Sequence, residues 1–152
     1  MVLMKRFLIY WLPPLLWMAI ISPVNDLLTT ASTSSLIVPI LKWLFPHAAL
    51  DTIETIHILI RKVSHFLEYA FLAFLLFRAF RSGNTTWRLK WTLYAGLISV
   101  CYAALDEGIQ TLIPSRTGSL YDWMIDSTGV VLMLSVLFFM NKKNRNYAEK
   151  SL

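Results

Sequence analysis

Four apolar stretches follow one another along the chain, at residues 7–21, 61–80, 87–110 and 121–140, with polar stretches between them. A helix needs about 20 mostly apolar residues to cross a bilayer, so this pattern predicts about four membrane-spanning helices. Pro13 and Pro14 interrupt the first stretch, but a spanning helix tolerates proline where its neighbours satisfy the freed backbone groups. No small-x-small cleavage site follows, which favours an uncleaved helix over a signal peptide.

The segment between the first two apolar stretches, residues 22–60, is long for a bare loop. It contains the Ser- and Thr-rich run TTASTSS, which predicts irregular structure. The run LIVPILKWLF, residues 36–45, is too short to span and contains Pro39, so we predict an interfacial or re-entrant segment. Asp51 has capping-box spacing to Glu54, and the helix that it begins is predicted to continue into the second span. His47 and His57 are predicted to lie at the surface.

The composition excludes an ordinary soluble domain. Hydrophobic residues make up 57% of the 152 residues and charged residues 15%, with a mean hydropathy of +0.57, whereas soluble domains carry more charge. We therefore predict a single all-α domain over residues 1–152. It is an integral membrane bundle of about four transmembrane helices, with the interfacial or re-entrant segment between the first two. The single cysteine, Cys101, excludes an internal disulfide framework, and its apolar surroundings predict a buried side chain.

Basic residues predict the orientation of the spans. They cluster before the first apolar stretch, between the second and third, and after the fourth, as Lys5, Arg6, Arg78, Arg81, Arg88, Lys90, Lys142, Lys143, Arg145 and Lys150. Arg116 is the only basic residue between the third and fourth stretches. Because basic loops remain on the cytoplasmic side, both termini and the middle loop are predicted to be cytoplasmic. The net charge of +5 at pH 7 then reports orientation rather than binding to nucleic acid.

Ionisable residues inside the apolar stretches are the candidate functional residues. Glu68, Asp106 and Asp126 lie about 6–10 Å inward from the predicted outer ends of their stretches, at about 1.5 Å per helical residue. A lone ionisable group in hydrocarbon costs at least about 2.5–3.5 kcal/mol, so acids at matching depth are predicted to face one another inside the bundle. His65 lies one turn from Glu68, although a buried hydrogen bond between helices would also explain that pair.

Two sequence blocks resemble the VanZ-like family of small bacterial membrane proteins. RKVSHFLEYAFLAFLLFRA matches a K-x-x-H-x-x-E-Y-like helix, and DEGIQTLIPSRTGSLYDWMIDSTG matches a D-E-x-x-Q…P-x-R-x-x-S-x-x-D-x-x-x-N-x-x-G block, with Asp126 where Asn is common. The resemblance covers residues 61–129, nearly half of the chain, in the family's order. The matching residues are His65, Glu68, Tyr69, Asp106, Glu107, Gln110, Pro114, Arg116, Ser119, Asp122 and Gly129.

The resemblance implies a multi-pass protein of the bacterial plasma (inner) membrane with a role at the cell envelope, because the family is named for a protein associated with teicoplanin resistance. Together with the polar residues, it predicts an outward-facing site that handles or protects a lipid-linked envelope component. Arg61, Lys62 and Arg116 would bind phosphate. The alternatives are a membrane-embedded hydrolase or transferase acting on an envelope lipid, and a structural or regulatory membrane partner protein.

The candidate ligand-binding residues are Arg61, His65, Glu68, Tyr69, Asp106, Glu107, Gln110, Arg116, Ser119, Asp122 and Asp126. If the protein is an enzyme, its acid, base and proton-transfer groups would be His65, Glu68, Asp106 and Glu107. One histidine among carboxylates suits a hard divalent ion, but the spacing does not match a zinc helix such as H-E-x-x-H, so no metal ligand is assigned and the cofactor is left open. Ser119 and Asp122 also have the spacing of a helix cap. The expected partners are the lipid bilayer and a lipid-linked envelope precursor.

Overall fold

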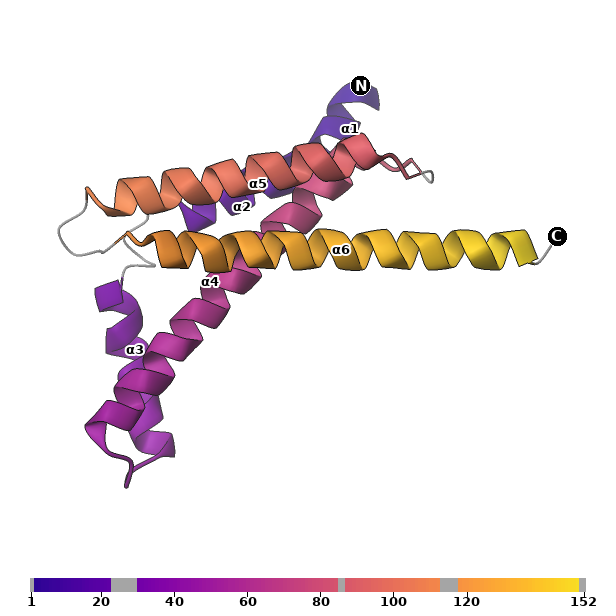
Figure 1. Cartoon of the computed structure of the whole chain (residues 1–152). Coiled ribbons are helices and arrows are strands. Elements are labelled where there is room, and N and C mark those ends of the chain that lie inside the picture. Colours follow the sequence, from indigo (N-terminus) through magenta and orange to yellow (C-terminus); the bar gives the residue numbers. More distant parts are fainter. Residues whose placement is uncertain (1, 23–29, 85–86, 113–117, 151–152) are drawn as a thin grey trace.

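The computed structural model describes residues 2–22, 30–84, 87–112 and 118–150, and these form helices joined by short connections, with no strand among them (Figure 1). The prediction of an all-α bundle is confirmed. The helices are α1 (Val2–Tyr10), α2 (Leu12–Ile21), α3 (Thr30–Leu44), α4 (Leu50–Arg81), α5 (Leu89–Gln110) and α6 (Leu120–Lys150).

The first apolar stretch forms two consecutive helices rather than one. α1 ends one residue before Trp11, and α2 begins one residue after it. Pro13 and Pro14 have no N–H to donate, so two of the backbone hydrogen bonds that would join the helices are missing. The Trp11 N–H still donates to the carbonyl of Phe7 at 2.8 Å. α1 and α2 therefore follow one another closely, with the break set by the proline pair.

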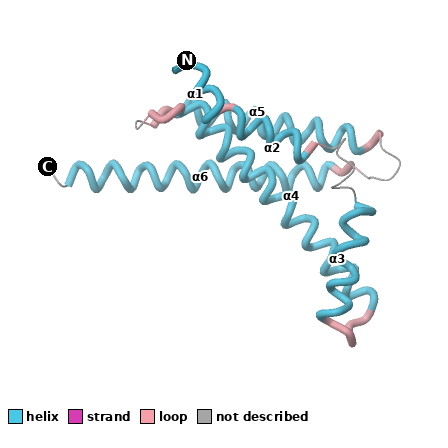
Figure 2. Tube along the Cα trace, turned by 180° about the vertical axis from the view of Figure 1, so that it is seen from behind, coloured by secondary structure: helices cyan, strands magenta, loops and turns pink. Residues whose placement is uncertain are grey.

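α3 and the first half of α4 form a helical hairpin at one end of the bundle (Figure 2). Residues 30–35 are helical, so the prediction of irregular structure is wrong for them. Intrinsic preferences of Ser and Thr are weak, and packing in the hairpin overrides them. The Oγ of Ser34 lies 3.5 Å from the Nε2 of His57. His57 is buried here, which corrects its predicted surface position, whereas His47 is exposed as predicted.

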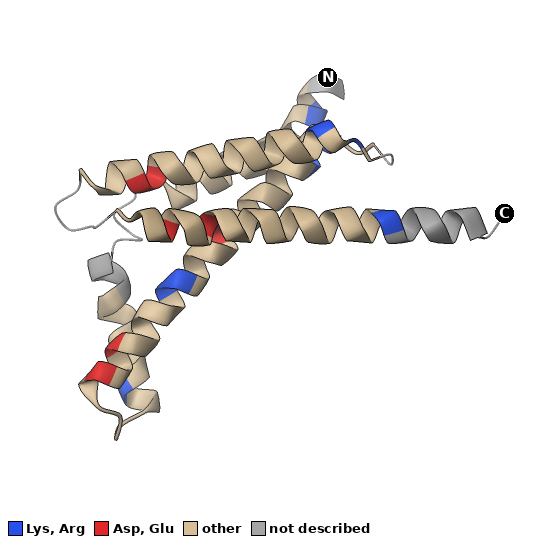
Figure 3. Cartoon of the chain, in the orientation of Figure 1, with Lys and Arg blue, Asp and Glu red and all other residues tan. Residues whose placement is uncertain are grey.

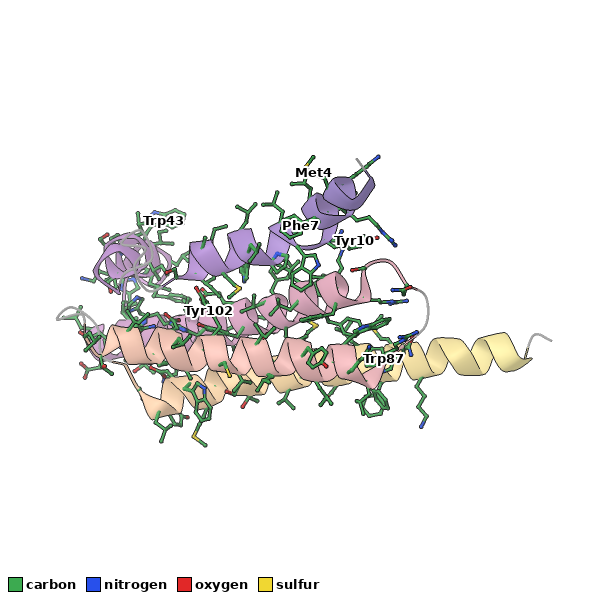
Figure 4. All side chains as sticks on the ribbon, turned by 90° about the horizontal axis from the view of Figure 1, so that it is seen from above. Met4, Phe7, Tyr10, Trp43, Trp87 and Tyr102 are labelled. Atoms are coloured by element: carbon green, nitrogen blue, oxygen red, sulfur yellow. The ribbon has the colours of Figure 1, made fainter. Side chains whose placement is uncertain are left out.

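The outer side of this hairpin is apolar. Leu36, Ile40, Trp43 and Phe45 all have exposed side chains, with Trp43 80% exposed. Figure 4 places Trp43 on the side of α3 that is turned away from α5 and α6. An apolar face that carries a tryptophan suits the boundary between headgroups and acyl chains. The interfacial or re-entrant position of residues 36–45 stays a prediction.

α4 is the longest helix and crosses α5 and α6 obliquely (Figures 1 and 2). Its 32 residues extend about 48 Å at about 1.5 Å per residue, more than the hydrocarbon core of about 30 Å. The predicted continuation into the second span is therefore confirmed. The N-cap position is Ala49 without a side-chain cap, so the predicted cap role of Asp51 is wrong. Asp51 lies in the first turn, where its negative charge interacts favourably with the helix dipole and stabilises the helix.

α4, α5 and α6 share one core. α6 approaches α4 at Gly129, where a side-chain carbon would collide with the backbone carbonyl of Phe66. Glycine at this position lets the two helices pack closely, as small residues do in membrane bundles. The core residues that are at most 1% exposed are Tyr69, Leu72, Ala73, Ala79, Ala95, Ala103 and Val130, together with Ile53 at 2% near the hairpin.

α2 is held against this three-helix core by hydrogen bonds from two aromatic side chains. The Tyr102 hydroxyl of α5 donates to the carbonyl of Met18 at 2.7 Å, and Figure 4 shows Tyr102 between α5 and α2. The Trp17 Nε1 of α2 donates to the backbone carbonyl of Glu68 at 3.0 Å. These bonds satisfy polar groups that would otherwise face lipid.

Within the described residues, three helical segments are long and apolar enough to cross a membrane, namely Met4–Ile21, Leu50–Arg81 and Leu120–Lys142. α5 corresponds to the third predicted span and lies beside α6, antiparallel to it (Figure 1). Asp106 and Glu107 lower its hydropathy, and its crossing of the membrane stays a prediction. Cys101 on α5 is exposed, so its predicted burial is wrong. In a bundle that faces lipid, apolar neighbours do not distinguish the core from the outer surface.

Candidate functional site

Charged side chains are distributed unequally over the bundle (Figure 3). Most Lys and Arg lie at the end where α4 stops and α5 begins, close to the N-terminus, with others midway along α4 and in the hairpin, whereas the acids of α5 and α6 lie at the end opposite the first group. This separation agrees with the alternation of basic clusters along the sequence. Which end faces the cytoplasm stays a prediction.

Tyr69 and Asp106 form a buried polar contact between α4 and α5. The Tyr69 hydroxyl donates to Oδ2 of Asp106 at 2.7 Å, and both side chains are buried. The second oxygen of this carboxylate, Oδ1, is also buried and has no hydrogen-bond partner. The structure thus brings together two of the predicted site residues and leaves one acceptor atom unsatisfied.

Glu107 links α5 to the beginning of α6. Its Oε2 accepts the N–H of Ser119 at 2.7 Å, and the Oγ of Ser119 accepts the N–H of Tyr121 at 3.1 Å. Ser119 therefore caps α6, as predicted. In a capping box, the acid three residues further on would receive the serine N–H. Glu107 from the neighbouring helix takes that place here, and its Oε1 remains buried without a partner.

Asp126 is the most enclosed acid of the site. It is 0% exposed, and within the described part of the chain neither of its carboxylate oxygens has a hydrogen-bond partner. The Nδ1 of His65 lies 3.7 Å from its Oδ1, which is beyond hydrogen-bond range. Glu107, Asp106, Glu68 and Asp122 all act electrostatically on Asp126. Glu107 of α5 and Asp126 of α6 therefore lie close together, as their matching depths predicted, and Glu68 of α4 lies within electrostatic range of Asp126.

A pocket opens on the surface next to this buried group. Its volume is about 90 Å³, and its lining includes Arg61, Lys62 and His65 of α4 and Asp122 of α6. The Lys62 Nζ lies 2.7 Å from Oδ1 of Asp122 and 4.6 Å from the ring centroid of Tyr121. His65 lines this pocket and also lies next to the buried Asp126. It therefore stands between the pocket and the buried acids.

A second hollow of about 400 Å³ lies between the end of α5 and the beginning of α6. Its wall is mostly apolar and includes Ala104, Leu120 and Trp123. Gly118 borders it, and a side-chain carbon there would collide with the backbone carbonyl of Glu107. The hollow is open to the surface of the bundle and has one carboxylate in its lining.

The remaining predicted residues have different outcomes. Glu68 is partly buried on the same helix as His65, and its backbone carbonyl accepts the bond from Trp17. Gln110 is buried at the end of α5. Arg116 lies outside the described residues, so its predicted role as a phosphate ligand stays a prediction.

Two features of the site were not predicted. The first is Tyr121, whose ring centroid lies 4.6 Å from the Lys62 Nζ. The second is the transfer of the capping role from Asp122 to Glu107. Both depend on the rotation of α6 relative to its neighbours, and no pattern along one segment reports that rotation.

The family model described as VanZ/LLP1 matches residues 7–141, which is most of the chain and includes every residue of the site. No curated protein and no solved structure matches the chain.

Proposed function

The chain belongs to the VanZ-like family, and we propose that this membrane protein binds the phosphate group of a lipid-linked cell-envelope component at an outward-facing site. It acts in the bacterial plasma membrane with both termini in the cytoplasm. Binding the headgroup there handles or protects the component, which gives a physical basis for a link to glycopeptide (teicoplanin-type) resistance.

The pocket lined by Arg61, Lys62 and His65 is the observation that carries this proposal. Within the part of the chain that the structure describes, Arg61 makes no ion pair or side-chain hydrogen bond. A planar guanidinium can bind two phosphate oxygens at once. Lys62 is held in place by Asp122 at 2.7 Å, and its side chain forms part of the wall of the same pocket. The volume of about 90 Å³ leaves room for several waters or one phosphate group.

The surface beside the pocket suits an acyl or prenyl chain. Ile58, Leu59 and Val63 of α4 are about half exposed, at 51%, 60% and 48%. A charged pocket bordered by such a surface matches an amphipathic ligand, because the headgroup and the chain need opposite environments. This combination favours a lipid over a free phosphate ion.

Lipid-dependent thermal unfolding of the detergent-solubilised protein tests the proposal. The ligand is a polyprenyl monophosphate, and the matching polyprenol without phosphate is the comparison. We expect the phosphate form alone to raise the melting temperature of the wild-type protein. In Arg61→Gln this rise should be largely lost, since the bidentate contact disappears.

Lys42→Gln is the matched control, because Lys42 is an exposed basic residue on α3 outside the pocket. It should respond to the lipid as the wild type does. Equal stabilisation by phosphate and polyprenol, or an unchanged response in Arg61→Gln, would contradict the assignment. Loss of the phosphate from the lipid during incubation with wild-type protein would instead support the alternative of a membrane-embedded hydrolase.

The link to resistance is tested in cells. Expression in a teicoplanin-susceptible bacterium is expected to raise the inhibitory concentration of teicoplanin, and Arg61→Gln should remove most of that increase. An equal increase with both proteins would separate resistance from the pocket and favour a structural or regulatory role.

A further inference from the structure

We propose that His65, Glu107 and Asp126 together bind one divalent cation, with Mn²⁺ as the representative ion. This site lies behind the phosphate pocket and does not depend on the lipid ligand. The three residues come from α4, α5 and α6, so an ion there would join the three helices of the core.

The spacing of the ligand atoms is the first argument. One nitrogen of His65 and one carboxylate oxygen from each of Glu107 and Asp126 all lie within 4.8 Å of one another. Two atoms that bind one ion at about 2.0–2.6 Å are separated by at most about 4–5 Å. The His65 Nδ1 to Asp126 Oδ1 distance of 3.7 Å is too long for a hydrogen bond and falls inside this range.

The unsatisfied atoms are the second argument. Both oxygens of Asp126, Oε1 of Glu107 and Nδ1 of His65 are buried and have no hydrogen-bond partner among the residues that the structure describes. Asp126 is 0% exposed. A buried carboxylate without a hydrogen-bond partner or counter-charge is strongly unfavourable. Four unpartnered atoms on three neighbouring residues are unlike an ordinary core, in which buried polar atoms are paired.

The charge around the group is the third argument. Asp106, Glu68 and Asp122 add further negative charge within electrostatic range of Asp126. The ammonium group of Lys62, which lines the adjoining pocket, is paired with Asp122 at 2.7 Å. A divalent cation would neutralise two carboxylates and use the imidazole nitrogen as a third ligand, so it satisfies the atoms that the protein leaves unpaired.

The donor set indicates the class of cation. Carboxylate oxygens suit Mg²⁺, Ca²⁺ and Mn²⁺, whereas imidazole suits transition metals. Mn²⁺ accepts both kinds of ligand. The group contains no thiolate, because Cys101 is exposed elsewhere on α5. Mn²⁺ is also paramagnetic, so its binding can be counted directly.

Mn²⁺ binding to the detergent-solubilised full chain, with no polyprenyl lipid present, tests the inference. Electron paramagnetic resonance measures free Mn²⁺ during a titration. We expect one bound equivalent in the wild type and a rise in melting temperature that a chelator reverses. Because lipid is absent, failure here would leave the proposed lipid function standing, and failure of lipid binding would leave this site standing.

Glu107→Gln, Asp126→Asn and His65→Gln should each weaken Mn²⁺ binding at least about tenfold, the range seen when support for a metal ligand is removed. The matched controls are Glu54→Gln and His47→Gln, since both residues are exposed and lie outside the group. They should bind one equivalent with wild-type affinity. These controls show whether losing any acid or histidine of the protein is enough to weaken Mn²⁺ binding.

Asp126→Asn provides a second readout in the absence of metal. It removes a charge that neighbouring acids disfavour, so the metal-free variant should melt at or above the wild-type temperature while losing the Mn²⁺-dependent rise. His65→Gln keeps the test decisive if Asp126→Asn fails to accumulate, because the His65 side chain is 23% exposed. No saturable binding in the wild type, or equal binding in wild type and all three variants, would overturn the inference.

Discussion

The buried acids of this protein differ in their hydrogen-bond partners. Asp106 receives the hydroxyl of Tyr69, Glu107 receives the N–H of Ser119, and Asp126 has no hydrogen-bond donor. The sequence identified these residues because ionisable groups are conspicuous in apolar stretches. It did not identify the pairs, because each contact depends on how far every helix is rotated about its axis. The burial of Asp126 in particular follows from the packing of α6.

The Tyr69 to Asp106 bond should contribute measurably to folding. In Tyr69→Phe, the carboxylate loses its donor while the ring still fills the core. We expect the free energy of unfolding in detergent to fall by about 1–3 kcal/mol. Tyr121→Phe is the control, because Tyr121 is 64% exposed, and its change should stay within about 0.5 kcal/mol. Equal effects of the two substitutions would show that the buried bond has no special role.

The charges of Glu68 and Asp106 are expected to serve ligand binding more than folding. Glu68→Gln and Asp106→Asn keep side-chain volume, and the asparagine carbonyl can still accept the Tyr69 hydroxyl. We expect both variants to insert into membranes at wild-type levels and to lose the stabilisation by polyprenyl phosphate. Membrane fractions and melting curves measure the two properties separately. A variant that retains the lipid response assigns that residue to structure, and failure of both to accumulate would favour a folding role.

Two alternative roles of Arg116 can be distinguished by the substitution Arg116→Lys. A lysine keeps the positive charge but loses the planar fork that binds two phosphate oxygens. If Arg116 is a phosphate ligand, Arg116→Lys should reduce the melting-temperature rise caused by polyprenyl phosphate, with insertion and basal stability unchanged. If it only neutralises nearby acids, the substitution should leave the lipid response unchanged. An identical lipid response in wild type and variant would remove Arg116 from the proposed binding site.

At the scale of the helices, the sequence predicts long apolar helices better than the breaks and connections between them. Three predicted spans coincide with α4, α5 and α6 because about 20 apolar residues in sequence are a strong local signal. The break at Trp11 and the helical state of residues 30–35 were missed. The first depends on which backbone bonds the proline pair removes, and the second depends on packing of α3 against α4, which no local preference reports.

The close approach of α4 and α6 at Gly129 predicts opposite effects of two equivalent substitutions. A methyl group at Gly129 would collide with the Phe66 carbonyl, so Gly129→Ala should lower the free energy of unfolding by about 1–3 kcal/mol. Gly108 on α5 has no atom within 4 Å of the same position. Gly108→Ala should therefore raise stability by up to about 1 kcal/mol through helix preference. Thermal unfolding of both variants decides this, and a stable Gly129→Ala would contradict the close contact.

At the scale of the whole molecule, the separation of charges predicts its orientation. Reporter fusions after Lys142 and within residues 81–88 should read as cytoplasmic, because basic flanks stay inside. A fusion next to Gly118 should read as external, on the side of the acids and the phosphate pocket. A cytoplasmic reading at Gly118 would reverse the orientation and place the proposed site on the inner face of the membrane.

The contact between Gly129 and Phe66 lies almost beside the site, since His65 is the next residue on α4 and Asp126 is three residues away on α6. If α4 tilted relative to α6, this contact would be the pivot point. A rocking of α4 by about 10° would move its Leu50 end by about 4 Å, because that end is about 24 Å from Phe66. Asp126 lies about 4.5 Å from this contact along the axis of α6, so it would shift by less than about 1 Å relative to α4. Such a tilt would thus move the Leu50 end of α4 and the hairpin much more than the site, and the spacing between Asp126 and His65 would stay nearly constant.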